Sequence, residues 1–361
     1  MIKRKLYWIL VICLLVNLAK GQSIGRELQV SNKLAVPFLL LNTDAVSSGM
    51  GGAGSTLTMR SGTPDLNPAK VSFLEPRFSI NLTYTPWLRK LVADRKLLYI
   101  GGAYKLTDKI ALTASLNYLT YGQVEMTDNY QNDLGNIKPT EYIGNLGISK
   151  RFGENLSIAM RLKLIQSNLY GSGASTIMIQ SGTAYCADVF AIQRLSLQIW
   201  GKDSQLGLGL EVTNIGPKIS YFNSPDQKSY LPTNMKIGTS LRLFMDAETE
   251  IGIALDVNKL LVPKNPQSND QSISESIFSS FNPLFGDMGA SIGAEYDFKK
   301  TVSFRLGYNL QESDRSLGSF FALGLGLNHK NIDLNMAYLM GDQQKSFLSN
   351  TMRLSLGYSI R

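Results

Sequence analysis

The sequence predicts an all-β protein: a transmembrane, antiparallel up-and-down β-barrel of about fourteen strands with an N-terminal plug segment. Three observations support this fold class. Apolar and polar residues alternate after residue 76, short and long connections alternate between those segments, and the chain opens with a short basic and apolar run. The first two observations are typical of a closed sheet in lipid, and the third is typical of an exported protein.

The alternating segments have the two-residue period of β-strands. In 155–168, Leu156 and Ile158 interleave with Ser157 and Ala159. Because successive side chains of a strand point to opposite faces, such a segment has one apolar and one polar face. The predicted strands are residues 77–86, 96–106, 109–120, 141–151, 155–168, 182–199, 204–215, 233–244, 248–260, 288–298, 301–311, 317–328, 331–341 and 349–361.

The connections between these strands alternate in length. Short connections such as Thr107-Asp108 and His329-Lys330 follow the even-numbered strands, and long ones such as 121–140 and 261–287 follow the odd-numbered strands. Bacterial outer-membrane barrels have short periplasmic turns and long extracellular loops. We therefore expect a multi-pass protein of the outer membrane with both termini periplasmic. A secreted, soluble all-β protein is the alternative, but it gives no reason for connections to sort by parity.

The two faces of the predicted strands carry different chemistry. Arg161, Lys163 and Glu211 belong to the polar face, and an Arg or Lys facing lipid at mid-bilayer costs about 2–4 kcal/mol. We therefore expect these three residues to face the lumen. Aromatic residues near strand ends suit interfacial girdles, and they are Tyr84, Trp87, Tyr99, Tyr104, Tyr118, Tyr121, Tyr142, Trp200, Tyr296, Tyr308, Tyr338 and Tyr358.

The first 21 residues have the pattern of a secretory signal peptide. Lys3, Arg4 and Lys5 precede an apolar run from Leu6 to Leu18, which is shorter than the roughly 20 residues of a spanning helix. We expect cleavage near Gly21. The processed chain then keeps one cysteine, Cys186, which excludes an internal disulfide and a cysteine metal site.

Residues 22–76 lack sustained alternation, and residues 77–361 form the predicted barrel. A segment of this length before the first strand can fold into the lumen as a plug, and a leader without fixed structure is the alternative. Within it, residues 49–54 match the dinucleotide-binding pattern GxGxxG, but a polar stretch precedes them and no helix is predicted after them. These glycines are better interpreted as allowing tight turns and a close approach to the barrel wall.

Composition indicates neither catalysis nor nucleic-acid binding. The net charge of +8 includes four basic residues of the signal peptide, and no basic cluster interleaves with aromatic residues. His329, the single histidine, lies in a predicted turn, and the acidic residues form no catalytic constellation. We predict a non-enzymatic protein without catalytic residues, a cofactor or a metal.

Several stretches resemble the PorV family of outer-membrane barrels, which belongs to the type IX secretion system of Bacteroidota and to the wider group of fatty-acid-transporter-like (FadL-like) barrels. They occur in family order along nearly the whole processed chain. They are Pro37–Ala45 continuing to Gly51, Asn67–Lys70, Tyr84–Leu91, Thr213–Tyr221, Tyr230–Asn234 and Leu255–Pro263. The chain departs from the family pattern at Leu66, at Val46-Ser47 and at the final Arg361.

The resemblance implies a fourteen-stranded barrel with a plug and a role as a carrier. Its expected partners are the translocon (of the SprA or Sov type), the C-terminal signal domain of secreted cargo, and a PorU-type sortase that attaches cargo to lipopolysaccharide. Outer-membrane lipid would surround the barrel. The alternative function is passive transport of hydrophobic small molecules, as in FadL-like barrels, and it requires an apolar pocket in the lumen and a lateral gap in the wall.

Two regions are candidate partner-binding surfaces. Trp87, Leu88 and Arg89 follow the first strand at the external rim, where an aromatic residue beside an arginine suits a binding hot spot. A membrane-belt Trp with a snorkelling Arg explains them equally well. The loop 261–287 carries many apolar groups for an exposed loop, namely Ile273, Ile277, Phe278, Phe281, Leu284 and Phe285. We favour this loop as the contact, with packing of the loop onto the rim as the alternative.

Overall fold

The computed structural model describes residues 34–57, 66–86, 94–127, 133–169, 180–222, 228–263, 272–284, 286–311, 318–341, 348 and 350–360. The predicted signal peptide lies outside these residues. Residues Lys33–Arg361 form one compact unit. Among the described residues, no helix combines the length and the apolarity needed to cross a membrane.

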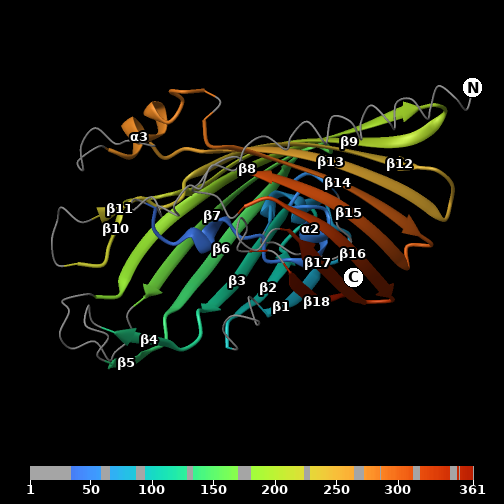
Figure 1. Cartoon of the computed structure of the whole chain (residues 1–361). Coiled ribbons are helices and arrows are strands. Elements are labelled where there is room, and N and C mark those ends of the chain that lie inside the picture. The colour runs from blue at the N-terminus through green and yellow to red at the C-terminus, as the bar shows by residue number, and fades with distance from the viewer. Residues whose placement is uncertain are drawn as a thin grey trace, which may run out of the picture. The chain divides into compact units, whose positions relative to one another are not determined.

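The compact unit is built around a closed β-barrel (Figure 1). In the described residues, fourteen antiparallel strands pair with their neighbours in barrel order, and the last pairs with the first. The barrel strands are β1 (Phe78–Pro86), β2 (Lys96–Lys105), β3 (Ile110–Thr120), β6 (Thr140–Phe152), β7 (Leu156–Asn168), β8 (Gly182–Ile199), β9 (Lys202–Ile215), β12 (Asn234–Phe244), β13 (Thr249–Leu260), β14 (Met288–Phe298), β15 (Val302–Gln311), β16 (Phe320–His329), β17 (Ile332–Met340) and β18 (Thr351–Ile360). The predicted fold class and strand number are confirmed.

Closure depends on the pairing of β1 with β18. Seven residue pairs join them, from Phe78 with Ile360 to Tyr84 with Leu354. This pairing leaves no free sheet edge in the barrel, so the backbone groups of both strands are hydrogen-bonded. A sheet without such closure would expose unpaired N–H and C=O groups to lipid, at several kcal/mol for each group.

Short and long connections lie at opposite ends of the barrel, as their alternation predicted. We call these the turn end and the loop end. Trp200 and Gly201 form a two-residue turn between β8 and β9, and their φ angles of 52° and 71° are those of a type I′ hairpin. Strand β9 therefore begins at Lys202, two residues before the predicted start. The C-terminal strand β18 ends at the turn end.

The loop end carries short elements that the two-residue pattern did not predict. They are the hairpins β4 (Val124–Thr127) with β5 (Asp133–Ile137) and β10 (Ile219–Ser220) with β11 (Lys228–Ser229), and the helix α3 (Ile273–Ser279). Figure 1 shows all five at the same end of the barrel. The strand pairs have five residues or fewer per strand, which is too short for alternation to distinguish them from other loop residues.

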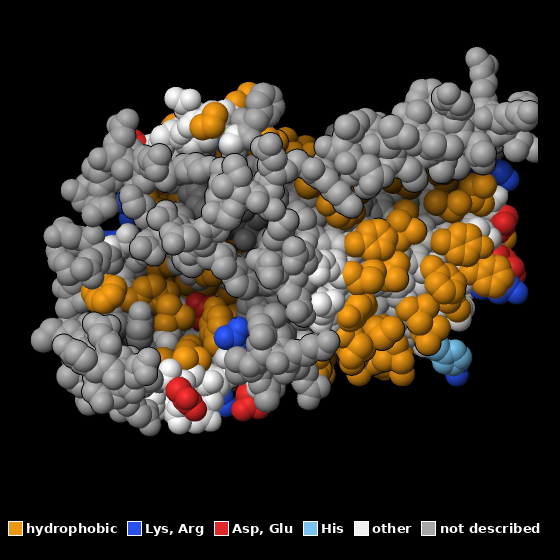
Figure 2. All heavy atoms as spheres, in the orientation of Figure 1, with side chains coloured by type: hydrophobic (Ala, Val, Ile, Leu, Met, Phe, Trp, Pro, Cys, Tyr) orange, Lys and Arg blue, Asp and Glu red, His pale blue; other side chains and the backbone are white. Residues whose placement is uncertain are grey.

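Lipid-facing and lumen-facing residues alternate along every strand. In β1, Ile80 and Leu82 are exposed on the outer wall, whereas Asn81 and Thr83 are buried. Figure 2 shows the outer wall covered with hydrophobic side chains, and charged side chains gather at the turn end. This distribution suits an apolar band in the bilayer flanked by water.

Most of the predicted girdle aromatics lie on the outer wall, but two do not. Tyr99 is 1% exposed and faces the lumen. Tyr121 follows β3 and donates a hydrogen bond of 2.9 Å to the Glu141 carboxylate. Their assignment as girdle residues was wrong, because position near a strand end does not decide which face a side chain occupies. Trp87 lies outside the described residues.

Three further helices precede the barrel and lie within it: η1 (Pro37–Leu40), α2 (Ala45–Gly49) and η2 (Pro68–Phe73). Each is too short to be stable alone. Asp44 caps α2 by accepting a 2.8 Å hydrogen bond from the Ser47 N–H, and Asn67 caps η2 in the same way with Ala69 at 2.9 Å. We call residues 34–57 and 66–76 the inner segment.

A substitution on β9 tests the assignment of the two faces. Leu208 is 41% exposed on the outer wall near the middle of β9. We expect Leu208→Arg to lower the free energy of unfolding by about 2–4 kcal/mol, because the charge would sit in hydrocarbon. Leu208→Met is the matched control and should retain nearly full stability. Urea titration of the barrel refolded in lipid, read by heat modifiability, measures both. Equal stability of the two variants would contradict the face assignment.

Candidate functional site

The lumen beneath the loop end is apolar and is filled by the start of the inner segment. Val36, Phe38 and Leu41 are buried there among lumen-facing residues of the strands. The wall residues of this cluster include Leu97, Leu119, Ile143, Ile165, Ala184, Cys186, Phe320, Ala322 and Leu339. Cys186 is thus a small buried residue that faces the lumen.

The glycine-rich turn after α2 touches the wall directly. A Cβ added to Gly51 would lie 2.5 Å from the backbone nitrogen of Tyr308 in β15, and one added to Gly49 would lie 2.9 Å from the Cα of Gly324 in β16. Gly51 also has a φ of 69°, which a residue with a side chain rarely adopts. These glycines therefore allow the backbone of the inner segment to approach the wall closely, as the sequence suggested. This role explains the GxGxxG pattern without a bound nucleotide.

Buried polar groups fasten the inner segment to the middle of the barrel. The Asp256 carboxylate accepts hydrogen bonds from the Ser55 N–H at 3.0 Å and the Ser55 hydroxyl at 2.8 Å. Asn67 donates to the Glu211 carboxylate at 2.9 Å. Within the inner segment, Lys70 donates to the Gly54 carbonyl at 2.8 Å and joins its two parts. Without the inner segment, the Asp256 and Glu211 carboxylates would lose these hydrogen bonds, at about 1–3 kcal/mol for each unmade bond.

The wall has an irregularity at Asp188, where the pairing of β8 with β9 shifts register. Asp188 is fully buried and contacts Arg161 at 2.6 Å and Lys163 at 2.9 Å. It also accepts a 2.7 Å hydrogen bond from the N–H of Asn214, whose φ is 61°. The bulge thus brings the carboxylate to two lumen cations. Arg161 and Lys163, with Glu211, face the lumen as predicted.

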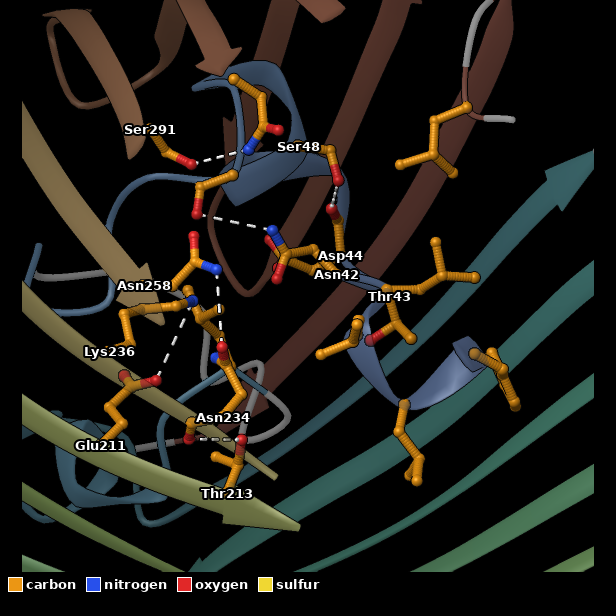
Figure 3. Close-up of a pocket in the computed structure, with 18 of the residues that line it drawn as sticks. Asn42, Thr43, Asp44, Ser48, Glu211, Thr213, Asn234, Lys236, Asn258 and Ser291 are labelled. Atoms are coloured by element: carbon orange, nitrogen blue, oxygen red, sulfur yellow. Dashed lines mark hydrogen bonds and ion pairs between the residues drawn. The ribbon is translucent and has the colours of Figure 1, made fainter. Parts of the chain in front are cut away.

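A cavity of about 150 Å³ with a mixed polar and apolar lining remains between the inner segment and the wall. Figure 3 shows Asn42, Asp44 and Ser48 of the inner segment on one side and wall residues such as Glu211 and Lys236 on the other. A volume of this size holds about five water molecules. Carboxamides, hydroxyls and charged groups share its lining with apolar side chains such as Phe38, Leu41 and Phe320.

At the loop end, α3 and the turn that follows it present apolar side chains to solvent. Phe278 is 76% exposed, Leu284 56% and Ile273 39%. Ile277 and Phe281 are half-buried, and the Lys259 ammonium lies 5.7 Å from the centre of the Phe281 ring. Of the predicted partner-binding residues, the structure thus leaves Ile273 and Phe278 most accessible. Trp87, Leu88, Arg89 and Phe285 lie outside the described residues.

The helix α3 is capped at its N-terminus, and hydrogen bonds to Tyr230 and Lys259 tie it and the turn after it to the barrel. Ser272 and Glu275 form a reciprocal capping box, and the hydrogen bond from the Ser272 N–H lowers the pKa of the exposed Glu275 carboxyl. Ser276, on the buried side of α3, donates a 3.3 Å hydrogen bond to the Tyr230 hydroxyl. Lys259 at the end of β13 donates to the Gly286 carbonyl at 2.6 Å. The exposed apolar groups therefore stand on a fixed base.

Comparison with known proteins identifies the family. The family model described as type IX secretion system protein PorV matches residues 26–267, more than half of the chain. The chain belongs to the PorV family. A PorV-family chain with this closed barrel is an outer-membrane component of the type IX secretion system. A search of curated proteins finds no match.

Solved structures show that the PorV-family chain shares its fold with hydrocarbon transporters. A TodX monoaromatic hydrocarbon channel mutant (deltaS2S3; TodX is from Pseudomonas putida) is 11% identical, with a TM-score of 0.57, covering 89% of this chain and 99% of that one. The toluene transporter TbuX of Ralstonia pickettii is 12% identical, with a TM-score of 0.51, covering 90% and 99%. Identities this low show a common fold alone.

The bulge at Asp188 and the hydrogen bonds that support it are structural features that the sequence pattern missed. Asn214 donates to the Pro232 carbonyl at 2.9 Å and accepts, through its own carbonyl, a 2.9 Å hydrogen bond from Thr233. These residues lie in two of the stretches that carry the family resemblance, Thr213–Tyr221 and Tyr230–Asn234. In the sequence, these two Pro-containing stretches interrupt the alternation of apolar and polar residues. That interruption does not indicate that the two stretches hydrogen-bond to each other.

Substitution of Gly51 tests the seating of the inner segment. We expect Gly51→Ala to destabilise the barrel by more than the roughly 1–2 kcal/mol that a left-handed alanine costs, because its Cβ would collide with the Tyr308 backbone. Gly153→Ala is the matched control: its φ is 60°, and a Cβ there meets nothing within 4 Å. Urea titration of refolded protein gives both values. A cost for Gly51→Ala no larger than for Gly153→Ala would mean that the glycine turn does not touch the wall.

Proposed function

We propose that this protein is a non-enzymatic carrier that receives secreted cargo at its loop end and passes it to the surface attachment machinery. It would bind the C-terminal signal domain of cargo leaving a SprA- or Sov-type translocon and deliver it to a PorU-type sortase, which attaches cargo to lipopolysaccharide. The observation that carries this proposal is an exposed apolar surface on α3 above a filled lumen.

The filled lumen supports a carrier that works from its rim. Two cavities inside the barrel, lined by described residues, measure about 150 and 40 Å³, and neither could admit a polypeptide. The inner segment is held by buried hydrogen bonds to Asp256 and Glu211, so it would not leave without unpairing them. We therefore infer that residues 22–76 act as a plug and that cargo does not pass through this barrel.

The loop-end surface has the character of a binding site. We call Ile273, Phe278 and Leu284, with the half-buried Ile277 and Phe281, the α3 patch. Exposed apolar groups of this kind on an anchored helix are unfavourable in water unless a partner covers them. Phe285 and the rim residues Trp87, Leu88 and Arg89 remain proposed members of the same contact surface.

The orientation of the barrel in the outer membrane is inferred from its short connections at one end and its long connections at the other. We propose that residues 1–21 are removed as a signal peptide, that the turn end with the C-terminus is periplasmic, and that the loop end faces the cell surface. The α3 patch then lies on the side where cargo leaves the translocon. The sequence also predicted a periplasmic N-terminus, which lies outside the residues that the structure describes.

Transport of hydrophobic small molecules is the second candidate, supported by the fold shared with toluene transporters and by the apolar upper lumen. The chain's own Val36, Phe38 and Leu41 occupy that apolar region. The remaining cavity of about 150 Å³ is lined by polar as well as apolar residues. A pull-down separates the two functions: secretion partners and cargo favour the carrier, and lipid or hydrocarbon without them favours the transporter.

Charged substitutions in the α3 patch test the carrier proposal. We expect Ile273→Glu with Phe278→Glu to leave a heat-modifiable barrel but to weaken partner binding by about 30-fold or more, the effect of losing a hot spot worth 2 kcal/mol. Cargo should then be lost from the surface and the medium, as it should on deletion of 268–282. Immunoblots of cargo and a pull-down of the translocon measure these effects.

Ser274→Glu is the matched control, because Ser274 is exposed on the same helix and the substitution adds a similar charge. It should leave secretion unchanged. Normal secretion by the double variant, or by the deletion variant, would show that the loop is structural and that the binding surface lies elsewhere.

A further inference from the structure

Two arginine side chains meet at one aromatic ring near the turn end of the lumen. Arg151 is the second-last residue of β6. Arg194 lies on β8, and its backbone N–H donates a 2.8 Å hydrogen bond to the carbonyl of Asn155, in the turn between β6 and β7. The guanidinium carbon of Arg194 lies 4.1 Å from the centre of the Phe73 ring, and that of Arg151 lies 5.9 Å from it. Because Phe73 is the last residue of η2, the wall and the inner segment both contribute to this cluster.

Buried nitrogen atoms of both guanidinium groups lack a hydrogen-bond acceptor among the described residues. Arg194 is 8% exposed, and its Nε and Nη2 atoms have no partner there. The Nε atom of Arg151 has none either. The Phe73 ring does not replace an acceptor, because an aromatic ring attracts the face of a guanidinium, whereas the N–H donors lie in the guanidinium plane. The cluster therefore presents several unused donors of positive charge.

Other arginines of the lumen wall at this end are paired with carboxylates. Arg242 contacts Glu250 at 2.8 Å and Glu295 at 3.1 Å, and Arg305 contacts Glu295 at 2.6 Å. In the part of the chain that the structure describes, no carboxylate forms such a pair with the two arginines beside Phe73. A buried charge without a counter-ion is unfavourable, so an anion from outside the chain would stabilise this cluster.

We propose that Arg151 and Arg194 form a binding site for a phosphate ion at the turn end of the lumen. Two guanidinium charges match the charge of about −1.5 to −2 that a phosphate group carries at neutral pH, whereas a carboxylate would neutralise one of them. Arginine also binds phosphate oxygens with two parallel N–H donors. Bound phosphate would hold β6 and β8 against Phe73 and thereby fasten η2 in the lumen.

The source of the phosphate is the solvent at the turn end. Arg151 is half-buried, so solvent reaches the cluster. Both arginine side chains lie on the lumen face of their strands, away from the lipid headgroups around the barrel. On the proposed orientation this solvent is the periplasm, but the site itself does not depend on the carrier function.

Calorimetric titration of the purified barrel with inorganic phosphate tests this site. The protein is kept in maltoside micelles, which contain no phosphate, and sodium chloride holds the ionic strength constant. Arg151→Gln and Arg194→Gln each remove one charge of the site. Lys299→Gln is the matched control, because it removes one charge at the same end of the barrel from a side chain that is 54% exposed. Heat modifiability verifies that each barrel is folded and gives its melting temperature with and without phosphate.

We expect the wild-type barrel to bind one phosphate per chain, and each arginine variant to bind it about ten-fold more weakly or worse, as the loss of a hydrogen-bonded charge predicts. Lys299→Gln should bind like the wild type. Phosphate should raise the melting temperature of the wild type and of the control but not that of Arg194→Gln. No saturable binding by the wild type would overturn the proposal, whether or not the variants assemble. Equal binding by the wild type and Arg194→Gln would also overturn it.

A parallel titration with phosphatidylglycerol, in phosphate-free buffer, tests the source of the phosphate. We expect no saturable binding of this lipid, because Arg151 and Arg194 face the lumen. Binding of the lipid by the wild type that is lost in Arg194→Gln would overturn the assignment to a soluble ion and assign the site to a lipid headgroup.

Discussion

Backbone hydrogen bonding in lipid is the constraint on which the other features of this protein depend. Hydrocarbon offers no partner for an unpaired N–H or C=O group, so a sheet can span the bilayer only by closing on itself. The pairing of β1 with β18 completes that closure. Closure in turn fixes the alternation of faces, because every second side chain must meet lipid. It also sorts the connections, because adjacent antiparallel strands return the chain to alternate ends.

The same closure creates a lumen that must be filled or solvated. Arg161, Lys163 and Glu211 cannot face lipid, so they lie inside, where each needs a partner. Asp188 neutralises the first two from a bulge in the wall, and the inner segment provides Asn67 for the third. The inner segment therefore completes the polar interior of the barrel, and its glycines let its backbone reach the wall without a gap.

The sequence predicted what depends on period and spacing, and it did not predict what depends on contacts distant in the chain. Strand boundaries followed from alternation, and the face of Leu208 followed from the same two-residue period. Tyr99 and Tyr121 were misassigned because proximity to a strand end carries no information about inward or outward direction. The Asp188 bulge was missed because it depends on contacts between β8, β9 and the loop residues Pro232 and Thr233. No local sequence pattern encodes such contacts. The rim residues Trp87, Leu88 and Arg89 remain predictions.

The path of the inner segment through the lumen shows most clearly what the sequence alone could not predict. A segment before the first strand was expected to enter the lumen, but composition gives no direction of travel within it. Direction is decided by which wall residues complement which part of the segment. Val36 and Phe38 match the apolar region near the loop end, and Ser72 matches Ser157 near the turn end. The inner segment thus complements the barrel wall along its length, apolar near the loop end and polar near the turn end. This order places Leu34 beside Tyr230, at the base of the α3 patch.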